Sequence, residues 1–347
     1  MASKLQKALF SAIEHQYLAQ VKKIVQAREK ASLITDWQKL LEPKSLDTVL
    51  HAAVRVKHES ILKYLLENCS SCLEQSNSSS MRPLHVATVQ CHMYAVNLLL
   101  AAGAEVDAPS ENHMTPLMLA SGQQERDALH IVRMLLNSGA NDAACNTDGW
   151  NSSHICCRSG SKKILEALVQ ADSRPVLAFT HAGESALHIA AGNGRSDLLP
   201  VLFKHGHSSC SSVCAAHGRS PLLHAVAGGH IRTAHVLLGI WSDARDQELD
   251  NRGRNALQLA VEAGDVKAVR FAADELKLDA RHQDNNGETC VHIAAANGHW
   301  QLLPVLVRDL KCDVSVIDKQ GRTALDVARI FHRAECEEIL LNLNSRQ

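Results

Sequence analysis

Histidine and cysteine are the residues of this chain that could most readily do chemistry. The 347-residue sequence contains 20 histidines and 11 cysteines, and both side chains bind metals or transfer protons in other proteins. Five of the histidines recur at one position of a repeated motif. They are His51, His85, His154, His188 and His292. A recurring imidazole indicates a structural role, with hydrogen bonds to a Thr or Ser hydroxyl at a helix start and to nearby backbone, rather than a ligand or a catalyst.

The cysteines form no complete metal motif. Cys69 and Cys72 have half of a zinc-site spacing, but no second pair of ligands follows nearby, and a structural zinc site needs four ligands. Cys210 and Cys214 are incomplete in the same way. We therefore expect no bound metal and no disulfide framework, because an odd number of scattered cysteines in a long chain is typical of reduced cytosolic thiols. In the pair Cys156–Cys157 we expect one buried and one surface thiol.

Sequence signatures of enzymes and cofactors are missing as well. The sequence has no GxxxxGK[ST] phosphate loop, no GxSxG nucleophile elbow and no HExxH motif, so we expect neither catalysis nor a cofactor. The net charge is -1, whereas binding to nucleic acid or a membrane surface calls for a basic excess. No stretch of 18 apolar residues is present that would span a membrane.

A repeated motif organises most of the chain. It appears as TVLHAA, RPLHVA, TPLMLA, NSSHIC, SALHIA, SPLLHA, NALQLA, TCVHIA and TALDVA. The position that usually holds leucine recurs at intervals of 33 to 36 residues. It falls at Leu50, Leu84, Leu117, Ser153, Leu187, Leu222, Leu257, Val291 and Leu325. Nine copies at this period predict a repeat array, in which each unit stacks on its neighbours to bury a continuous core.

Each copy follows one plan. A short inner helix begins at the motif, an outer helix with apolar clusters such as residues 61–66 and 131–136 follows, and a finger-like loop leads to the next copy. Several fingers read Asp-x-x-Gly, where the glycine supplies a positive φ angle. We expect an all-α solenoid with short β-hairpin-like fingers. Residues 1–46 are predicted to form a helical N-terminal cap, and residues 47–347 nine repeats that start near residues 47, 81, 114, 150, 184, 219, 254, 288 and 322.

Two copies carry additional residues. Residues 122–132 lengthen the link between the two helices of the third repeat, and residues 215–218 follow a finger rich in Ser and Cys. Insertions in solenoids lie on the surface, so both segments are either partner contacts or tolerated loop length.

The period and the Thr-Pro-Leu-His motif identify the chain as a member of the ankyrin-repeat family. This resemblance implies binding to another protein through the inner helices and finger tips, which line an open concave face. The residues next to the finger turns are the expected contacts, because exposed Trp and Arg are frequent anchors of interfaces. They are His113, Asp148, Trp150, Asn151, Glu184, Arg219, Arg254, Glu288, Lys319 and Arg322.

Two segments resemble one branch of the ankyrin-repeat family more closely than the consensus. They are NTDGWNSSHICCRSG at residues 146–160, in which GWNS and His replace the usual motif, and AVEAGDVKAVRFAADELKLDAR at residues 260–281. The resemblance implies binding to the catalytic domain of alanyl-tRNA synthetase, which prevents serine mischarging. The branch accepts serine on finger-tip lysines. The corresponding tips here read Glu111–Asn112, Thr147 and Phe179–Thr180, so serine acceptance is not carried over.

Two functional hypotheses remain open: a partner of alanyl-tRNA synthetase, and a scaffold for another partner such as a kinase or a transcription factor. In both, we expect a cytoplasmic monomer that can also be nuclear. Trp150 also has two interpretations. It is either an anchor for the partner or a ring that packs against the adjacent finger and covers the space left by Ser153.

Overall fold

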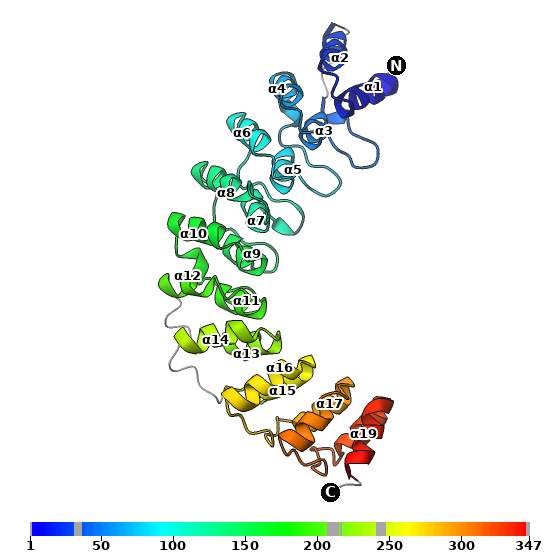
Figure 1. Ribbon diagram of the computed structural model, residues 1–347. Coiled ribbons are helices and arrows are strands. Elements are labelled where there is room, and N and C mark those ends of the chain that lie inside the picture. The colour runs from blue at the N-terminus through cyan, green and yellow to red at the C-terminus, as the bar shows by residue number, and fades with distance from the viewer. Residues whose placement is uncertain (1, 31–36, 207–214, 216, 241–247, 345–347) are drawn as a thin grey trace. The chain divides into compact units, whose positions relative to one another are not determined.

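The computed structural model describes residues 2–30, 37–206, 215, 217–240 and 248–344 (Figure 1). The chain divides into two compact units, Met1–Val176 and Leu177–Gln347. Each unit is a stack of helix pairs, with the inner helices packed on one another and the outer helices behind them. The expected all-α repeat architecture is therefore confirmed.

Unit 1 begins with the helix pair α1 (Ala2–Glu14) and α2 (Leu18–Lys30), followed by a short turn of 3-10 helix at Trp37–Lys39. Helix α1 packs on α3, and α2 packs on α4. The inner helices are α3 (Val49–Arg55), α5 (Pro83–Val89), α7 (Pro116–Ser121) and α9 (Ser152–Ser159). The outer helices are α4 (Glu59–Asn68), α6 (Met93–Ala101), α8 (Ala128–Asn137) and α10 (Lys162–Ala171).

Unit 2 continues the same plan. Its inner helices are α11 (Ala186–Gly192), α13 (Pro221–Ala227), α15 (Ala256–Ala263), α17 (Cys290–Asn297) and α18 (Ala324–Ile330). Its outer helices are α12 (Leu199–Lys204), α14 (Ile231–Ile240), α16 (Val266–Arg270) and α19 (Ala334–Asn344). Two π-helical turns complete the outer layer, at Phe271–Glu275 and Val305–Asp309.

Several inner helices start where the motif predicts because a polar residue caps them. Thr48, Thr115, Ser220 and Thr323 accept a hydrogen bond from the backbone N–H three residues later, which satisfies a group that has no partner within the helix. Proline follows the cap at Pro116 and Pro221. Its missing N–H costs little in the first turn.

The recurring leucine position forms the core between the two layers. Leu50, Leu117, Leu187 and Leu257 are completely buried, and burial of one such side chain contributes roughly 1.5–3 kcal/mol. In the last copy Leu325 is only half-buried, because no further repeat packs on that side of it in the described chain. Ser153 replaces the leucine in the fourth copy and is buried as well.

Two departures from the repeat plan are local. Helix α7 ends at Ser121 and α8 begins at Ala128, so the lengthened link predicted for the third repeat is present. The outer layer of the seventh repeat instead ends in the π-helical turn Phe271–Glu275. The Ser/Cys-rich finger of the sixth repeat, with Cys210 and Cys214, lies outside the described residues.

No helix among the described residues is both long and apolar enough to cross a membrane.

Candidate functional site

The candidate site is the row of finger turns together with the first residues of the inner helices. In the seventh repeat, Asp250 fixes the turn, since its Oδ1 accepts hydrogen bonds from the backbone N–H of Arg252 and Arg254 at 2.9 and 3.0 Å. Gly253 has a φ of 73°, a conformation that side chains with a Cβ rarely adopt. Asn146 holds the finger of the fourth repeat in the same manner, through the N–H groups of Asp148 and Trp150.

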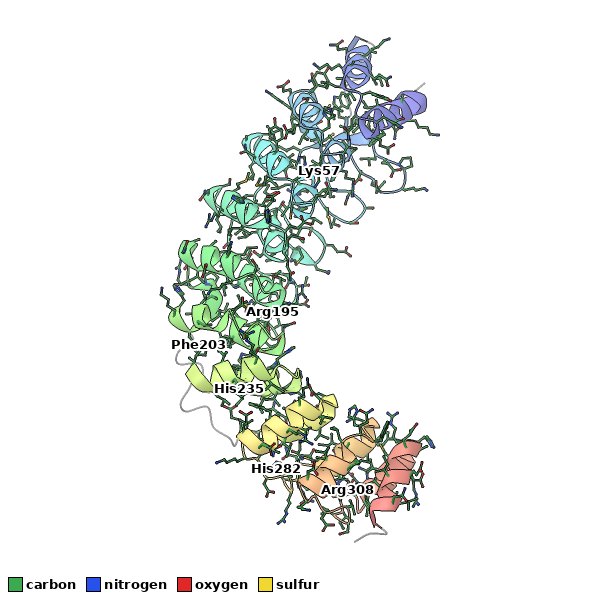
Figure 2. All side chains as sticks on the ribbon, in the orientation of Figure 1. Lys57, Arg195, Phe203, His235, His282 and Arg308 are labelled. Atoms are coloured by element: carbon green, nitrogen blue, oxygen red, sulfur yellow. The ribbon has the colours of Figure 1, made fainter. Side chains whose placement is uncertain are left out.

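Neighbouring fingers are joined by backbone hydrogen bonds. In unit 2, Asn251 N–H donates to the His217 carbonyl at 3.0 Å, Asn285 to Arg252 at 2.8 Å and Lys319 to Asn286 at 2.9 Å. The side chain of His282, which is labelled in Figure 2, adds a further link. Its Nε2 lies 2.7 Å from the Gly253 carbonyl oxygen. In unit 1, Thr147 N–H donates to the Asn112 carbonyl. The finger tips of each unit are therefore held in register before any partner binds.

The ten predicted contact residues differ in exposure. His113, Asp148 and Lys319 are exposed, while Trp150, Glu184, Arg219, Glu288 and Arg322 are half-buried. Asn151 and Arg254 are buried, with 0% and 6% of their surface exposed. The structure therefore leaves eight of the ten side chains accessible, three on unit 1 and five on unit 2.

Asn151 was predicted to contact a partner, but its side chain is buried and is used inside the protein. It caps helix α9, where its Oδ1 accepts the N–H of His154 at 3.1 Å, and its Nδ2 donates to the Pro175 carbonyl at 2.7 Å. Both ends of the amide are thus used inside unit 1.

Arg254 was also predicted to contact a partner, but it is buried and bound to two carboxylates of the protein. Its Nε and Nη2 donate to Asp250 Oδ2 at 3.0 and 2.7 Å, and its Nη1 donates to Glu262 Oε1 at 2.7 Å. Burial alone disfavours the charge of Arg254, but the hydrogen bonds from Asp250 and Glu262 outweigh burial and raise its pKa. Arg254 is therefore a structural cation.

Trp150 has two ring contacts within its own repeat. The guanidinium carbon of Arg158, on helix α9, lies 5.1 Å from the centroid of the Trp150 ring, and the His154 ring is 6.3 Å away at a tilt of 59°. The cation–π contact orients the indole and leaves it half-buried. Its use as a partner anchor stays a prediction.

The recurring histidines have the structural role predicted for them. The Nδ1 atoms of His51 and His85 each accept the backbone N–H of the capping residue at 3.1 Å. Their Nε2 atoms lie 2.9 and 2.8 Å from the carbonyl oxygens of Met81 and Ala108, so Nε2 carries the hydrogen and the rings are neutral. Burial lowers the pKa of both imidazoles.

The buried cysteines among the described residues are packing residues. Cys156 and Cys157 are both completely buried, so the expectation of one surface thiol in this pair was wrong; helix α9 is covered on both of the faces they occupy. Burial raises the pKa of Cys156 to about 12 and that of Cys72 to about 11, which keeps both thiols protonated. Within the described residues, no group of three or more His, Cys, Asp or Glu side chains could hold a metal ion.

Sequence reasoning missed two residues of this face. Glu262, on helix α15, binds Arg254 and also lies 3.5 Å from Arg219. His224, on α13, stands where the other repeats carry a small or aliphatic residue, and its ring lies edge-on to His188 at 5.5 Å. The Asp-x-x-Gly-Arg spacing at Asp250 would have indicated an ion pair between Asp250 and Arg254, four residues apart. The second ion pair of Arg254, with Glu262, becomes visible only in the folded structure.

The fold and the site are those of a repeat scaffold, and comparison with known proteins places the chain in a family. A model described as "Ankyrin repeats (3 copies)" matches residues 9–110, 95–178, 229–316 and 271–347. The chain belongs to the ankyrin-repeat family.

Several named proteins are similar to part of the chain. B-cell lymphoma 3 protein homolog of Mus musculus is 30% identical over 195 residues, which cover 54% of this chain and 42% of that protein. B-cell lymphoma 3 protein of Homo sapiens is 30% identical over 42% of this chain and 32% of its own length. The p105 subunit of nuclear factor NF-kappa-B from Gallus gallus is 25% identical over 57% of this chain and 20% of that protein. The matches thus span less than half of each relative.

Proposed function

We propose that the chain is a protein-binding scaffold whose finger tips and inner-helix starts contact a partner protein in the cytoplasm or the nucleus. The observation that carries the proposal is the prearranged row of fingers, which presents polar side chains such as Asp148 and Lys319 to solvent. A surface that is already ordered loses little conformational entropy on binding. The family is one of binding scaffolds rather than enzymes.

The partner is a protein that takes part in transcription or signalling. Support comes from the named relatives, one of which is a subunit of a nuclear factor. We assign the contacts to His113, Asp148, Trp150, Glu184, Arg219, Glu288, Lys319 and Arg322. Residues 1–46 act as the N-terminal cap in this proposal, because α1 and α2 cover the first helix pair, and residues 47–347 form the nine repeats of a monomer.

A second candidate function rests on the segment at residues 146–160, which resembles ankyrin repeat domain-containing protein 16. That resemblance implies a complex with alanyl-tRNA synthetase. Trp150 and His154 of this segment lie together in unit 1; His154 is buried, and the half-buried Trp150 is the part of the motif that a partner can reach. The named relatives support the first candidate more directly.

Affinity capture tests both candidates. The tagged chain is incubated with cell extract, and the retained proteins are identified by mass spectrometry. Trp150→Ala is expected to weaken capture of the main partner by at least about tenfold, as loss of an aromatic anchor does. The control is Trp300→Ala, because Trp300 is 42% exposed but precedes the outer layer of unit 2.

Three outcomes would decide between the candidates or reject part of the proposal. Absence of alanyl-tRNA synthetase from the captured proteins rules out the second candidate. If no protein is retained, both candidates are rejected. If Trp300→Ala and Trp150→Ala have equal effects, Trp150 is not an anchor of the binding surface.

A further inference from the structure

Arg219 and Arg254 occupy the same position in successive repeats, but only one of them has acidic partners of its own. Arg254 has Asp250 four residues before it and Glu262 eight residues after it, and both accept its hydrogen bonds. The corresponding positions around Arg219 hold Ala215 and Ala227. The sixth repeat therefore carries the cation without either carboxylate.

Arg219 instead reaches towards the acids of the next repeat, which Arg254 already uses. Its Nε lies 3.8 Å from Asp250 Oδ2, and its Nη2 lies 3.5 Å from Glu262 Oε2. The matching distances for Arg254 are both 2.7 Å. Three hydrogen bonds fix Arg254, while Arg219 has one bond at the limit of hydrogen-bond length.

The Arg219 guanidinium has one donor that is shielded from water but is not used. Its Nε is buried and has no hydrogen-bond partner among the described residues. An unused buried donor is unfavourable, so the pairing of Arg219 inside the chain is incomplete. The Arg219 side chain is 25% exposed, and a carboxylate that reached the exposed part of the guanidinium would form charge-assisted hydrogen bonds with it.

The surroundings of Arg219 define which anion fits. Exposed His217 is at the finger tip two residues earlier, and His224 has its Nδ1 3.9 Å from Glu184 Oε1 while its buried Nε2 has no partner among the described residues. Asp250 and Glu262 lie on the other side. The two carboxylates already present would repel a doubly charged phosphate more strongly than a singly charged carboxylate.

We propose that Arg219 is the anchor for a carboxylate carried by an acidic segment of the partner protein. The inference rests on the proposed scaffold function and adds the chemistry of the ligand: Asp or Glu side chains that bind the guanidinium of the sixth repeat. It also explains why this arginine, unlike Arg254, is left without acids of its own.

A defined acidic peptide tests this inference on the full chain. The probe is a capped, fluorescently labelled hexaglutamate peptide, with hexaglutamine as the uncharged counterpart, and binding is measured by fluorescence anisotropy. We expect Arg219→Gln to weaken hexaglutamate binding by about tenfold or more, as expected for a lost charge-assisted pair. Arg219→Lys keeps the charge but loses the planar fork, so its effect is expected to be intermediate.

Arg252→Gln is the matched control, because Arg252 is exposed on the next finger. Its substitution removes the same charge. It is expected to change binding by less than about twofold. The melting temperature by circular dichroism should be the same for all three variants. This shows that they are folded.

Three results would overturn the inference: equal weakening by Arg219→Gln and Arg252→Gln, equal binding of hexaglutamine, or displacement of the peptide by inorganic phosphate at lower concentration than by acetate. If Arg219→Gln still captures the cellular partner with full affinity, only the anchor is rejected. If the unmodified chain captures no partner at all, the scaffold function falls with it.

Discussion

At the scale of single residues, Arg252 and Arg254 lie on the same finger, but their environments differ. Arg254 is 6% exposed and bonded to two carboxylates, whereas Arg252 is exposed. Arg254→Ala would leave the buried Asp250 without its hydrogen-bonded cation, with Arg219 still 3.8 Å away, and we expect a loss of about 3 kcal/mol in the free energy of unfolding. Arg252→Ala should change it by less than about 0.5 kcal/mol. Urea unfolding followed by circular dichroism measures both, and equal losses would contradict the structural role of Arg254.

Lys277 gives a second prediction at the residue scale. It follows the π-helical turn of the seventh repeat and has a φ of 51°, a conformation that costs a residue with a Cβ roughly 1–2 kcal/mol. Lys277→Gly is therefore expected to stabilise the protein by about 0.5–1 kcal/mol. The matched control is Lys267→Gly in helix α16. There glycine should destabilise by about 1 kcal/mol. A destabilised Lys277→Gly protein in thermal unfolding would argue against the left-handed turn.

At the scale of the elements, neutral histidines link the inner helices to the following fingers. These histidines make the stability of the folded protein depend on pH. The pKa values of His51 and His85 are lowered in the folded protein by burial, and the unfolded chain binds protons below a pH of about 6.5. Their contribution is thus complete above this pH and is lost as the pH falls towards the folded pKa values. We expect the melting temperature to fall between pH 7 and pH 5.

His85→Gln separates the hydrogen bonds of the histidine from its titration. Gln258 already takes the histidine position in the seventh repeat, where it accepts the Asn255 N–H at 3.2 Å and donates to the Glu288 carbonyl at 2.9 Å. The variant should lose less than about 1 kcal/mol at pH 7, because both bonds are retained. It should also show a weaker dependence on pH. A pH dependence as steep as that of the unmodified chain would mean that other groups cause it.

Periodicity predicted most of the elements because the repeat pattern contains their caps, apolar faces and turns. It did not predict the π-helical turns Phe271–Glu275 and Val305–Asp309, because the motif spacing in these two repeats matches that of repeats whose outer layer is α-helical. The site was predicted less completely. Arg219 and Arg254 share a motif position, and what distinguishes them is Glu262 and Asp250, whose distances depend on how the repeats stack.

At the scale of the whole molecule, the proposed scaffold function requires that the partner contacts the finger side of the repeats and not the outer helices. The structure offers exposed positions for comparison on both sides. Asp148 and Lys319 are at finger tips, and Glu67 on α4 and Lys163 on α10 are on outer helices. The finger positions belong to different units, whereas both outer-helix positions belong to unit 1.

Site-specific photo-crosslinking measures this contact most directly. A benzoylphenylalanine replaces Asp148, Lys319, Glu67 or Lys163 in the full chain, the variants are irradiated in cell extract, and the crosslinked protein is quantified. If the finger side binds the partner, one and the same partner is crosslinked from Asp148, Lys319 or both, with only background from Glu67 and Lys163. Crosslinking of the partner from the outer-helix positions, with none from the finger tips, would contradict binding at the finger side.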